Sequence, residues 1–588
     1  MLLRDAKLNI SMVGVTSGAD DVFFSPKPEG YVLGKTKYVI ITGSVISGNG
    51  KGTASSTIAK TLQDRGLSVE PMKLESYLNV DSGTLNPFRH GEVFVLDDGT
   101  ETDLDLGTYE RMLNKNLTKQ NFVTSGTILS KVLEKERRGD YLGKDVQVIP
   151  HVTGEIKLAV RAVAASTKAD VVLVEIGGTV GDYENVYSLE ALREMAYEEG
   201  RGNFCFVNLT YILEPSSLGE QKSKAAQLGI KNLMQLGIQP DVVLCRAKNP
   251  VGEGIRRKIS LFGNVPYERV FSAQDVDNIY SLPLFFREKG IDEEICKVLG
   301  LAEKFPAINN EVLESFVRKA RVYDNSKDVI VGMAAKYIGA SDTYLSVVKA
   351  LEHAGFALGT RINIAWIDTQ AIEEGVVKVE DALKGVDALV VPGGFGSRGI
   401  EGKIECIKYC REHNVPFLGL CYGFQLALVE FARNVLGLEG AHTTEVDLEC
   451  AHPVIDLLPE QRTMNAKGGT MRLGGHDVVL LEGTKARVLH DSEIIRRRFR
   501  HRYECNPEYI KAFEDRGIIF SGRARNDEGR IMQVLEMLQT EHPFFMAVQF
   551  HPEFTSRPLR PDPLFLELIK NASKDSLARA VANVSANL

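Results

Sequence analysis

Residues 415–425 place a cysteine between two glycines at the end of an apolar run. The segment reads VPFLGLCYGFQ, so a short strand leads to Cys421 and a helical pattern begins directly after it. Gly419 and Gly423 permit the tight turn that exposes a nucleophile between a strand and a helix. The amino terminus of that helix favours a thiolate. A cysteine in an apolar run is usually a small core residue, but these flanking glycines favour a nucleophile.

A histidine and a glutamate stand two residues apart in AVQFHPEF. Alternate residues of an extended strand face the same way, so Glu553 is predicted to orient His551. Such a pair is common by itself. In VVPGGFGSRG, however, Gly393 and Gly394 offer backbone N–H groups to an oxyanion. The three segments together predict nucleophilic catalysis by a cysteine, a histidine and an oxyanion site.

A glycine-rich turn, GSVISGNGKGT at residues 43–53, follows a β-branched run and opens a helical pattern. Its glycines let backbone N–H groups approach phosphates, and Lys51 adds positive charge. The spacing departs from the usual phosphate loop, because Ser44 stands where the first glycine is expected and Gly52 follows the lysine. The pattern alone therefore indicates either a nucleotide-binding loop or an ordinary strand-to-helix turn.

Acidic residues alternate in ETDLD, and Glu175 ends the apolar run VVLVE. Alternation in an extended segment would put Glu101, Asp103 and Asp105 on one side. Ligands of open α/β sheets bind at the carboxyl ends of the strands, where Glu175 is expected. Hard oxygen ligands beside a phosphate loop indicate Mg²⁺. Alternating acids also mark a solvated edge, so this pattern alone leaves both interpretations open.

Two series of β-branched runs and helical segments must position these residues. The first begins at Lys37 with YVIITG and includes DVVLVEIGG, and the second begins at Asp328 with DVIVGMAAK, INIAWID and ALVVPGG. This alternation predicts an α/β fold with two parallel-sheet domains. A charged, helical connector from Glu293 to Ala320 separates them. The predicted organisation is an extension at 1–36, domains at 37–305 and 329–575, a linker at 306–328 and a tail at 576–588.

Composition excludes several classes of protein. The 588 residues are 44% hydrophobic and 25% charged with a net charge of −8, which fits globular domains and argues against a general nucleic-acid-binding role. The eight cysteines include no CxxC pair, so their number and spacing fit neither a disulfide scaffold nor a zinc ribbon. Without an apolar run of about 18 residues or a signal-peptide pattern, we expect no membrane segment and a cytoplasmic protein.

The amino-terminal domain resembles the amidoligase domain of CTP synthases. The resemblance lies in KYVIITGSVISGNGKG, MKLESYLNVDSGTLNPFRHGEVFVLDDGTETDLDLGTYER and VEIGGTVGDYEN. It implies a phosphate-loop-type, dethiobiotin-synthetase-like fold in which Lys73 neutralises the transferred phosphate and Asp105 and Glu175 bind Mg²⁺. The residues expected to bind ATP are Gly48, Asn49, Gly50, Lys51, Gly52, Thr53, Lys73 and Asp105. Those expected to bind UTP, and CTP at an overlapping feedback site, are Ser47, Asp182, Tyr183, Glu184, Lys222, Ser223, Lys224, Ala225, Ala226, Gln227 and Lys258.

The chain departs from this family at several nucleotide positions. The family usually has glycine at Ser44, leucine at Asn49, isoleucine at Tyr183, Asp-Pro at Glu75-Ser76 and Pro-Thr at Ala225-Ala226. These departures concern nucleotide affinity and feedback more than the reaction.

Residues 329–575 resemble class I glutaminase domains through the cysteine turn, the HPE segment and the PGGFG segment. The resemblance implies that Cys421 attacks the glutamine amide and that His551 passes a proton to ammonia. The residues expected to bind glutamine are Gly394, Tyr422, Gly423, Phe424, Gln425, Glu445 and Arg502. Tyr422 and Phe424 replace the usual leucine and methionine. The basic run at 496–502 is otherwise interpreted as a solvated face or a nucleic-acid patch, and with Arg472 it is a candidate for the region where GTP activates such enzymes.

The combined resemblance implies a glutamine-dependent CTP synthase. ATP would phosphorylate O4 of the uracil of UTP, ammonia would attack C4 and phosphate would leave, with GTP activation, CTP feedback, homotetramers and filaments as further expectations. One alternative is a glutaminase fused to a cobyrinate-type amidase, which GTETDLDLG and YLNVD disfavour. Another is a non-catalytic nucleotide-sensing filament protein, against which the intact set of catalytic residues argues.

Overall fold

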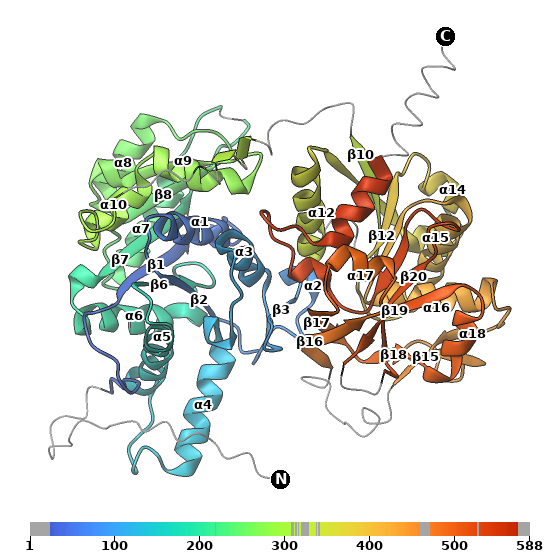
Figure 1. Ribbon diagram of the computed structural model, residues 1–588. Coiled ribbons are helices and arrows are strands. Elements are labelled where there is room, and N and C mark those ends of the chain that lie inside the picture. The colour runs from blue at the N-terminus through green and yellow to red at the C-terminus, as the bar shows by residue number, and fades with distance from the viewer. Residues whose placement is uncertain are drawn as a thin grey trace. The chain divides into compact units, whose positions relative to one another are not determined.

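The computed structural model describes residues 24–217, 219–306, 311, 314, 315, 317, 318, 328–336, 338, 341–457, 471–525 and 529–573. The chain forms two compact units, shown in Figure 1. The first unit comprises Met1–Asp81 and Thr108–Glu314, and the second comprises Ser82–Gly107 and Ser315–Leu588. The predicted boundary at residue 305 had assigned 82–107 to the first domain. Most of the predicted extension and linker, and the whole predicted tail, lie outside the described residues.

The first unit is built on a sheet of seven parallel strands, as the alternating pattern predicts. Their order across the sheet is β5 (Phe122–Thr124), β2 (Val69–Glu75), β6 (Val171–Ile176), β1 (Lys37–Ser44), β7 (Phe204–Tyr211), β8 (Val242–Ala247) and β9 (Val270–Gln274). The central strands are buried on both faces, which explains their continuous apolar runs.

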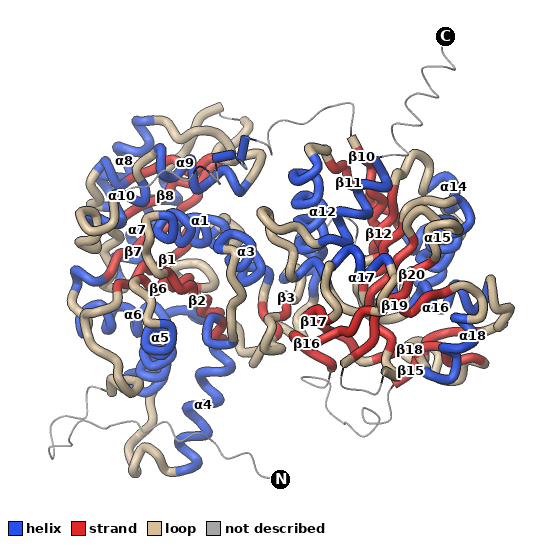
Figure 2. Tube along the Cα trace, viewed as in Figure 1, coloured by secondary structure: helices blue, strands red, loops and turns tan. Residues whose placement is uncertain are grey.

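Helices cover both faces of this sheet, and their separation from the strands is clear in Figure 2. They are α1 (Lys51–Asp64), α3 (Leu104–Leu113), α4 (Ser125–Arg138), α5 (Thr153–Thr167), α6 (Val186–Glu198), α7 (Lys224–Gln235), α8 (Glu253–Gly263), α9 (Leu282–Glu288) and α10 (Ile291–Val298). Helix α10 belongs to the first core, since Ile291 and Ile295 are fully buried, so the predicted connector begins after it. No helix of the described residues is long and apolar enough to cross a bilayer.

The described part of the predicted amino-terminal extension, residues 24–36, is tied to helices α5 and α6 by a buried ionic network. The Arg161 guanidinium donates to Glu198 at 2.6 Å and to Glu199 at 2.8 Å. It also donates to the Ser25 hydroxyl at 2.9 Å, and the N–H of Gly34 donates to Glu199 at 2.8 Å. The sequence pattern assigned no structural role to this segment.

We expect Arg161→Ala to destabilise the first unit by about 3–5 kcal/mol, because it leaves Glu199 buried without its counter-charge. The Arg161 side chain is 0% exposed. Urea unfolding followed by fluorescence and circular dichroism measures the loss. Arg193→Ala is the matched control, because its side chain is 40% exposed and its ion pair with Glu190 should contribute about 1 kcal/mol or less. Equal losses in the two variants would show that the network contributes no special stability.

The second unit contains a nine-stranded sheet in which only part is parallel. Strands β11 (Ile362–Asp368), β10 (Val329–Ala335), β12 (Ala388–Val391), β13 (Phe417–Leu420) and β21 (Phe545–Val548) run parallel, as predicted. Strands β20 (Met532–Met537), β19 (Ile518–Ala524), β16 (Arg472–Leu480) and β17 (Ile494–His501) extend it in antiparallel fashion. The prediction of a parallel sheet missed these four strands. Strands β16 and β17 mix buried with partly exposed residues, as is typical of antiparallel strands with one wetter face, whereas β20 is almost wholly buried.

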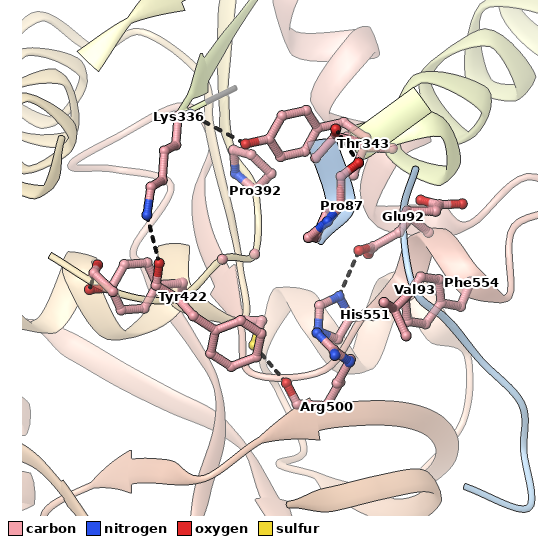
Figure 3. A pocket seen from close by; sticks show the side chains of 18 of the residues that line it. Pro87, Glu92, Val93, Lys336, Thr343, Pro392, Tyr422, Arg500, His551 and Phe554 are labelled. Carbon is pink, nitrogen blue, oxygen red and sulfur yellow. Dashed lines mark hydrogen bonds and ion pairs between the residues drawn. The ribbon is translucent and has the colours of Figure 1, made fainter. Parts of the chain in front are cut away.

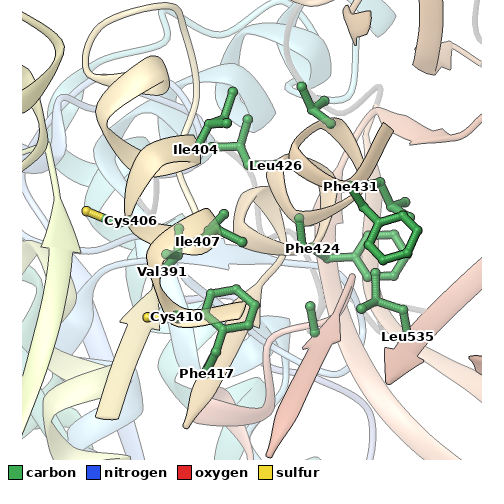
Figure 4. Close-up of a cluster of buried hydrophobic side chains, with 14 of the residues drawn as sticks. Val391, Ile404, Cys406, Ile407, Cys410, Phe417, Phe424, Leu426, Phe431 and Leu535 are labelled. Atoms are coloured by element: carbon green, nitrogen blue, oxygen red, sulfur yellow. The ribbon is translucent and has the colours of Figure 1, made fainter. Parts of the chain in front are cut away.

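The cysteine turn of the second unit rests on a continuous apolar core, shown in Figure 4. Helices α15 (Ile400–His413) and α16 (Tyr422–Asn434) pack together over the sheet, with Ile407, Phe424 and Phe431 buried between the layers. The remaining elements are α12 (Leu345–Leu358), α13 (Thr369–Glu373), α14 (Val379–Ala382), α17 (Lys485–His490), α18 (Ile510–Glu514) and a small sheet of β14 (Ala441–Thr443), β15 (His452–Leu457) and β18 (Tyr503–Cys505).

Residues 82–107, here called the inserted segment, fold as α2 (Pro87–His90), β3 (Phe94–Val95), β4 (Glu101–Thr102) and the start of α3. Carboxylate Glu92 is buried and accepts the backbone N–H of Ser346 at 2.8 Å. The Arg498 guanidinium donates to the carbonyl of Val95 at 3.1 Å. The inserted segment is therefore an integral part of the second unit.

Candidate active site

Cys421 occupies the predicted turn between strand β13 and helix α16. Its backbone has φ 51° and ψ −95°, a conformation that L-residues adopt at a cost and that recurs at functional sites. The flanking glycines are required by space, because a Cβ on Gly423 would lie 2.2 Å from the carbonyl oxygen of Val391 and one on Gly419 would lie 2.8 Å from the Cβ of Ala547. The strand, turn and helix thus agree with the sequence analysis.

His551 and Glu553 meet as expected, but by a different route. The Nδ1 of His551 lies 2.7 Å from Oε1 of Glu553. Strand β21 has already ended at Val548, and residues Pro552–Phe554 form a 3₁₀ turn, so the prediction that both side chains project from one extended strand is wrong. The turn brings the carboxylate back to the ring, while Phe554 stacks on the imidazole with centroids 4.9 Å apart.

The cysteine and the histidine line one cavity of about 260 Å³. Its wall contains six of the predicted residues: Gly393, Gly394, Cys421, Tyr422, His551 and Glu553. Figure 3 shows the cavity and labels Tyr422 and His551 among them. A Cβ on Gly393 would lie 2.9 Å from Cε1 of His551 and 3.5 Å from Cβ of Cys421, so the PGGFG loop crosses directly beside both groups. This is the position that an oxyanion-binding loop requires.

Five predicted glutamine-binding residues do not line this cavity, namely Gly423, Phe424, Gln425, Glu445 and Arg502. Phe424 is fully buried in the core. Glu445 still touches the loop, because its carboxylate accepts the N–H of Gly396 at 3.0 Å. Gln425 bonds to Gln549 at 3.3 Å, and Gln549 in turn donates to the Cys421 sulfur at 3.6 Å. Their role in binding glutamine stays a prediction.

The charges around His551 favour its protonated form. Burial lowers the pKa of the imidazole, but the charges of Glu553 and Cys421 outweigh burial and raise the pKa to about 10. An imidazolium beside a sulfur stabilises a thiolate, the reactive form of cysteine. Since this pKa lies above the ordinary value of about 6.5, protonated His551 stabilises the fold below that pH, and the contribution is lost as pH rises through about 10.

We therefore expect Glu553→Gln to slow alkylation of Cys421 by iodoacetamide by at least about tenfold at pH 7. Without the carboxylate charge the imidazole becomes neutral and no longer supports the thiolate. The difference should shrink as pH rises toward the range where a free thiol ionises. Mass spectrometry identifies the alkylated residue, and Glu541→Gln, at an exposed position, is the control. An unchanged rate in Glu553→Gln would show that the charge of Glu553 is not transmitted to the sulfur.

The cavity also contains residues that sequence reasoning missed. Lys403 on α15 is buried, and burial together with the charge of Lys336 lowers its pKa to about 8. Lys336 donates to the carbonyl of Phe395 at 3.2 Å. The hydroxyl of Tyr422, which was among the predicted glutamine-binding residues, donates to the carbonyl of Gly396 at 3.2 Å. These hydrogen bonds stabilise the position of the PGGFG loop. They join residues that are distant in sequence, so no spacing pattern predicts them.

The inserted segment supplies Pro87, Glu92 and Val93 to the same cavity. Arginines of the basic run at 496–502, for which the sequence left several interpretations open, bind this segment. Arg500 on β17 bonds to Glu101 at 2.7 Å with its side chain 12% exposed, and Arg498 is fully buried. Arg498 and Arg500 therefore do not belong to a solvated face, whereas Arg496, at the start of the run, is 54% exposed and pairs with Asp97 at 2.9 Å. Arg472, the other GTP candidate, lies with its guanidinium 5.9 Å from the ring centre of Phe499.

The glycine-rich turn of the first unit joins β1 to α1 as predicted. Gly50 caps the helix with φ 89°, and the buried Lys51 ammonium donates to the carbonyl of Gly178 at 2.8 Å. The Asn49 side-chain amide donates to the carbonyl of Leu209 at 3.2 Å, so it ties the glycine-rich loop to strand β7. Arg246, which sequence reasoning missed, approaches within 3.6 Å of the place that a Gly50 Cβ would take.

The two predicted Mg²⁺ ligands have different settings. Glu175, on β6, is fully buried and bonded to Lys73 at 2.6 Å. Asp105 belongs to the second unit and lies in the first turn of helix α3, so the predicted extended alternation of acids ends before it. The described residues contain no group of three or more His, Cys, Asp or Glu side chains arranged for a metal. One or two carboxylates nevertheless suffice for Mg²⁺ when phosphates complete its shell, so Glu175 and Asp105 fit the ion in kind.

Of the predicted UTP and CTP residues, Ser47 lies in the turn between β1 and α1, and the others lie on or directly before three helices of the first unit. Asp182, Tyr183 and Glu184 lead into helix α6, and Tyr183 is 92% exposed. Lys222 to Gln227 lead into and begin α7, and Lys258 lies on α8. Ala226 is fully buried against the core, so its side chain is not available to a ligand in this structure.

Comparisons with known proteins cover nearly the whole chain. A family model described as "CTP synthase N-terminus" matches residues 37–301, and one described as "Glutamine amidotransferase class-I" matches residues 340–571. A "CTP synthase" of Thermococcus kodakarensis is 49% identical over 540 residues, which are 92% of this chain and 99% of the relative. One of Clostridium acetobutylicum is 46% identical over 538 residues, 92% of this chain and 99% of the relative. Among solved structures, the glutaminase domain of Trypanosoma brucei CTPS with bound acivicin is 34% identical and covers 42% of this chain and 94% of that one, with a TM-score of 0.39.

Proposed function

The chain belongs to the CTP synthase family, so it is a glutamine-dependent ligase, and we propose that it converts UTP to CTP through a Cys-His-Glu glutaminase and a 4-phosphoryl-UTP intermediate. The observation that carries the glutaminase proposal is the single cavity shared by Cys421, His551 and the PGGFG loop. The proposal that UTP is the acceptor of the ammonia rests on membership of the family.

In the proposed glutaminase step, the thiolate of Cys421 attacks the side-chain amide of glutamine. The developing oxyanion is received by backbone N–H groups of the PGGFG loop, and imidazolium His551 delivers a proton to the leaving ammonia. Glu553, at 2.7 Å from the imidazole, keeps the ring oriented and charged. Water then releases glutamate, with His551 as the base. Gly394, Glu445 and Arg502 are proposed to hold the amino acid.

Ammonia is proposed to leave through the part of the cavity that the inserted segment lines. Pro87 and Val93 lie on the same cavity wall as Cys421. Apolar side chains such as these favour neutral ammonia over ammonium, and the buried carboxylate of Glu92, which also lines this part of the cavity, is engaged by the N–H of Ser346.

In the proposed synthetase step, the phosphate loop with Lys51 binds ATP, and Lys73 receives charge from the transferred phosphoryl group. Glu175 and Asp105 would hold Mg²⁺, which neutralises phosphate charge when bound. The transfer makes O4 of the uracil a phosphate leaving group, and ammonia displaces it at C4. The residues 182–184, 222–227 and 258 are proposed to contact UTP and, in feedback inhibition, CTP.

Regulation and assembly follow the same proposal. GTP would activate the glutaminase, and the enzyme would work as a homotetramer that also forms filaments. A cytoplasmic location agrees with the cysteines, all of which are free thiols.

One assay tests the proposal as a whole. The purified chain is incubated with UTP, ATP, Mg²⁺ and glutamine, with and without GTP, and CTP is separated by chromatography. We expect CTP and glutamate in equal amounts and a faster rate with GTP. Release of glutamate without CTP under all conditions would refute UTP as the acceptor.

A further inference from the structure

Three side chains from three elements meet at the carboxyl edge of the first sheet. Glu175 comes from β6, Lys73 from β2 and Tyr109 from α3. The Lys73 ammonium bonds to Oε1 of Glu175 at 2.6 Å, and the Tyr109 hydroxyl donates to Oε2 at 2.7 Å. Glu175 and Tyr109 are both 0% exposed. Neither the sequence patterns nor the family resemblance drew attention to Tyr109.

Both oxygens of the buried Glu175 carboxylate have a partner here, and the Lys73 ammonium also lies 3.3 Å from Oε1 of Glu75. Burying a carboxylate costs free energy unless a cation and hydrogen bonds compensate its charge. Here Oε1 of Glu175 is bonded to the Lys73 ammonium, and Oε2 accepts the hydrogen bond from Tyr109. A tyrosine hydroxyl is neutral at physiological pH and can donate one hydrogen bond, which here goes to Oε2 of Glu175. The hydroxyl therefore fixes the orientation of the carboxylate whichever cation is beside the other oxygen.

The proposed function requires a change of partners at Oε1. Lys73 is assigned to the transferred phosphate and Glu175 to the cation, yet in this structure the two are bonded to each other. An ammonium and a metal ion would compete for the same oxygen. The partner that the structure shows at Oε2 is the neutral hydroxyl of Tyr109.

We infer that Tyr109 is a positioning residue for phosphoryl transfer: its hydroxyl holds Oε2 of Glu175 so that Oε1 is exchanged between Lys73 and the divalent cation. This inference rests on the proposed function and adds a residue to it. It also makes Lys73 a competitor of the cation in the absence of nucleotide.

The test measures binding of Mn²⁺, a spectroscopic substitute for Mg²⁺, by electron paramagnetic resonance on the full chain. With a non-hydrolysable ATP analogue present, we expect Tyr109→Phe to weaken Mn²⁺ binding about tenfold or more, as the loss of an outer hydrogen bond to a metal ligand does. The Mg²⁺ concentration for half-maximal ammonia-dependent CTP formation should rise in parallel, while the KM for UTP stays within about twofold. Glutamine hydrolysis should be unchanged, which also reports that the protein is folded.

The matched control is Tyr141→Phe. The Tyr141 hydroxyl is buried in the same unit and has no hydrogen-bond partner among the described residues, so its removal should leave Mn²⁺ binding unchanged. Equal Mn²⁺ affinity in Tyr109→Phe and Tyr141→Phe would overturn the inference.

Lys73→Met gives a second measurement of opposite sign. Freed of its competitor, Oε1 of Glu175 should bind Mn²⁺ more tightly without nucleotide, whereas general damage to the site could only weaken binding. Weaker binding in Lys73→Met would contradict the exchange at Oε1. If the unmodified chain forms no CTP from UTP, the proposed function fails; if it forms CTP but Tyr109→Phe binds Mn²⁺ normally, only this inference fails.

Discussion

Cys421→Ala is expected to lower glutamine-dependent CTP formation by at least about 10³-fold while leaving ammonia-dependent formation within about twofold. The cysteine is the proposed nucleophile for glutamine, but ammonia added to the solution needs no hydrolysis. Its backbone has φ 51°, a conformation that recurs at functional sites, and His551 lines the same cavity. CTP formation is measured with saturating glutamine and, separately, with ammonium chloride at pH 8.5.

Cys450→Ala is the control for this variant. Cys450 is a free, partly exposed cysteine that lines no part of the cavity, so its loss should leave both activities intact. A parallel fall of both activities in Cys421→Ala, in protein that remains folded, would contradict two separate sites joined by ammonia.

Lys51→Ala is expected to lower CTP formation by about 10²-fold or more with either nitrogen source. The Lys51 ammonium sits at the start of α1, where the phosphates of ATP are proposed to bind, and it is already directed by its bond to Gly178 at 2.8 Å. Losing it removes charge that would stabilise the transferring phosphoryl group. Binding of ATP should weaken as well, and isothermal titration calorimetry measures this.

Lys60→Ala, on the same helix, is the control that tests whether replacing another lysine of α1 also lowers CTP formation. Lys60 pairs with Asp64 one turn away, at 2.5 Å, and its side chain is 20% exposed, so we expect little change in activity. Glutamine hydrolysis without nucleotides should persist in both variants. Normal CTP formation by Lys51→Ala would refute the assignment of the phosphate loop.

Sequence patterns predicted the turns, helices and strands whose structure is determined by residues close together in the sequence. The glycines beside Cys421 predicted a tight turn, and the structure leaves no room for a side chain at either position, since a Cβ there would collide with the backbone or with Ala547. The strand, glycine turn and helix around Lys51 were also predicted from local pattern, and there Gly48 and Gly50 are favoured by backbone conformation, with φ 69° and 89°. Apolar runs such as VVLVE correctly indicated strands buried on both faces.

The failures concern contacts between residues that are distant in sequence. Nothing in the basic run shows that Arg500 faces Glu101, about four hundred positions earlier, so that run read as solvent-exposed charge. The side-chain spacing of HPE suggested a strand because a 3₁₀ turn produces the same proximity by a different geometry. Tyr109 was missed for a similar reason: its partner is a carboxylate on another strand, and a single tyrosine in a helix has no distinctive spacing.

The placement of the inserted segment limits how this protein can be divided. A cut in the linker at 306–328 would yield a carboxyl-terminal fragment without Phe94, whose ring packs 5.0 Å from that of Phe554, and without the carbonyl that the buried Arg498 requires. The amino-terminal fragment would in turn carry an apolar strand with nothing to cover it. Gene fusion or fission at the linker would therefore exchange incomplete modules, and a functional chimera of two such enzymes must take residues 82–107 from the same parent as the glutaminase.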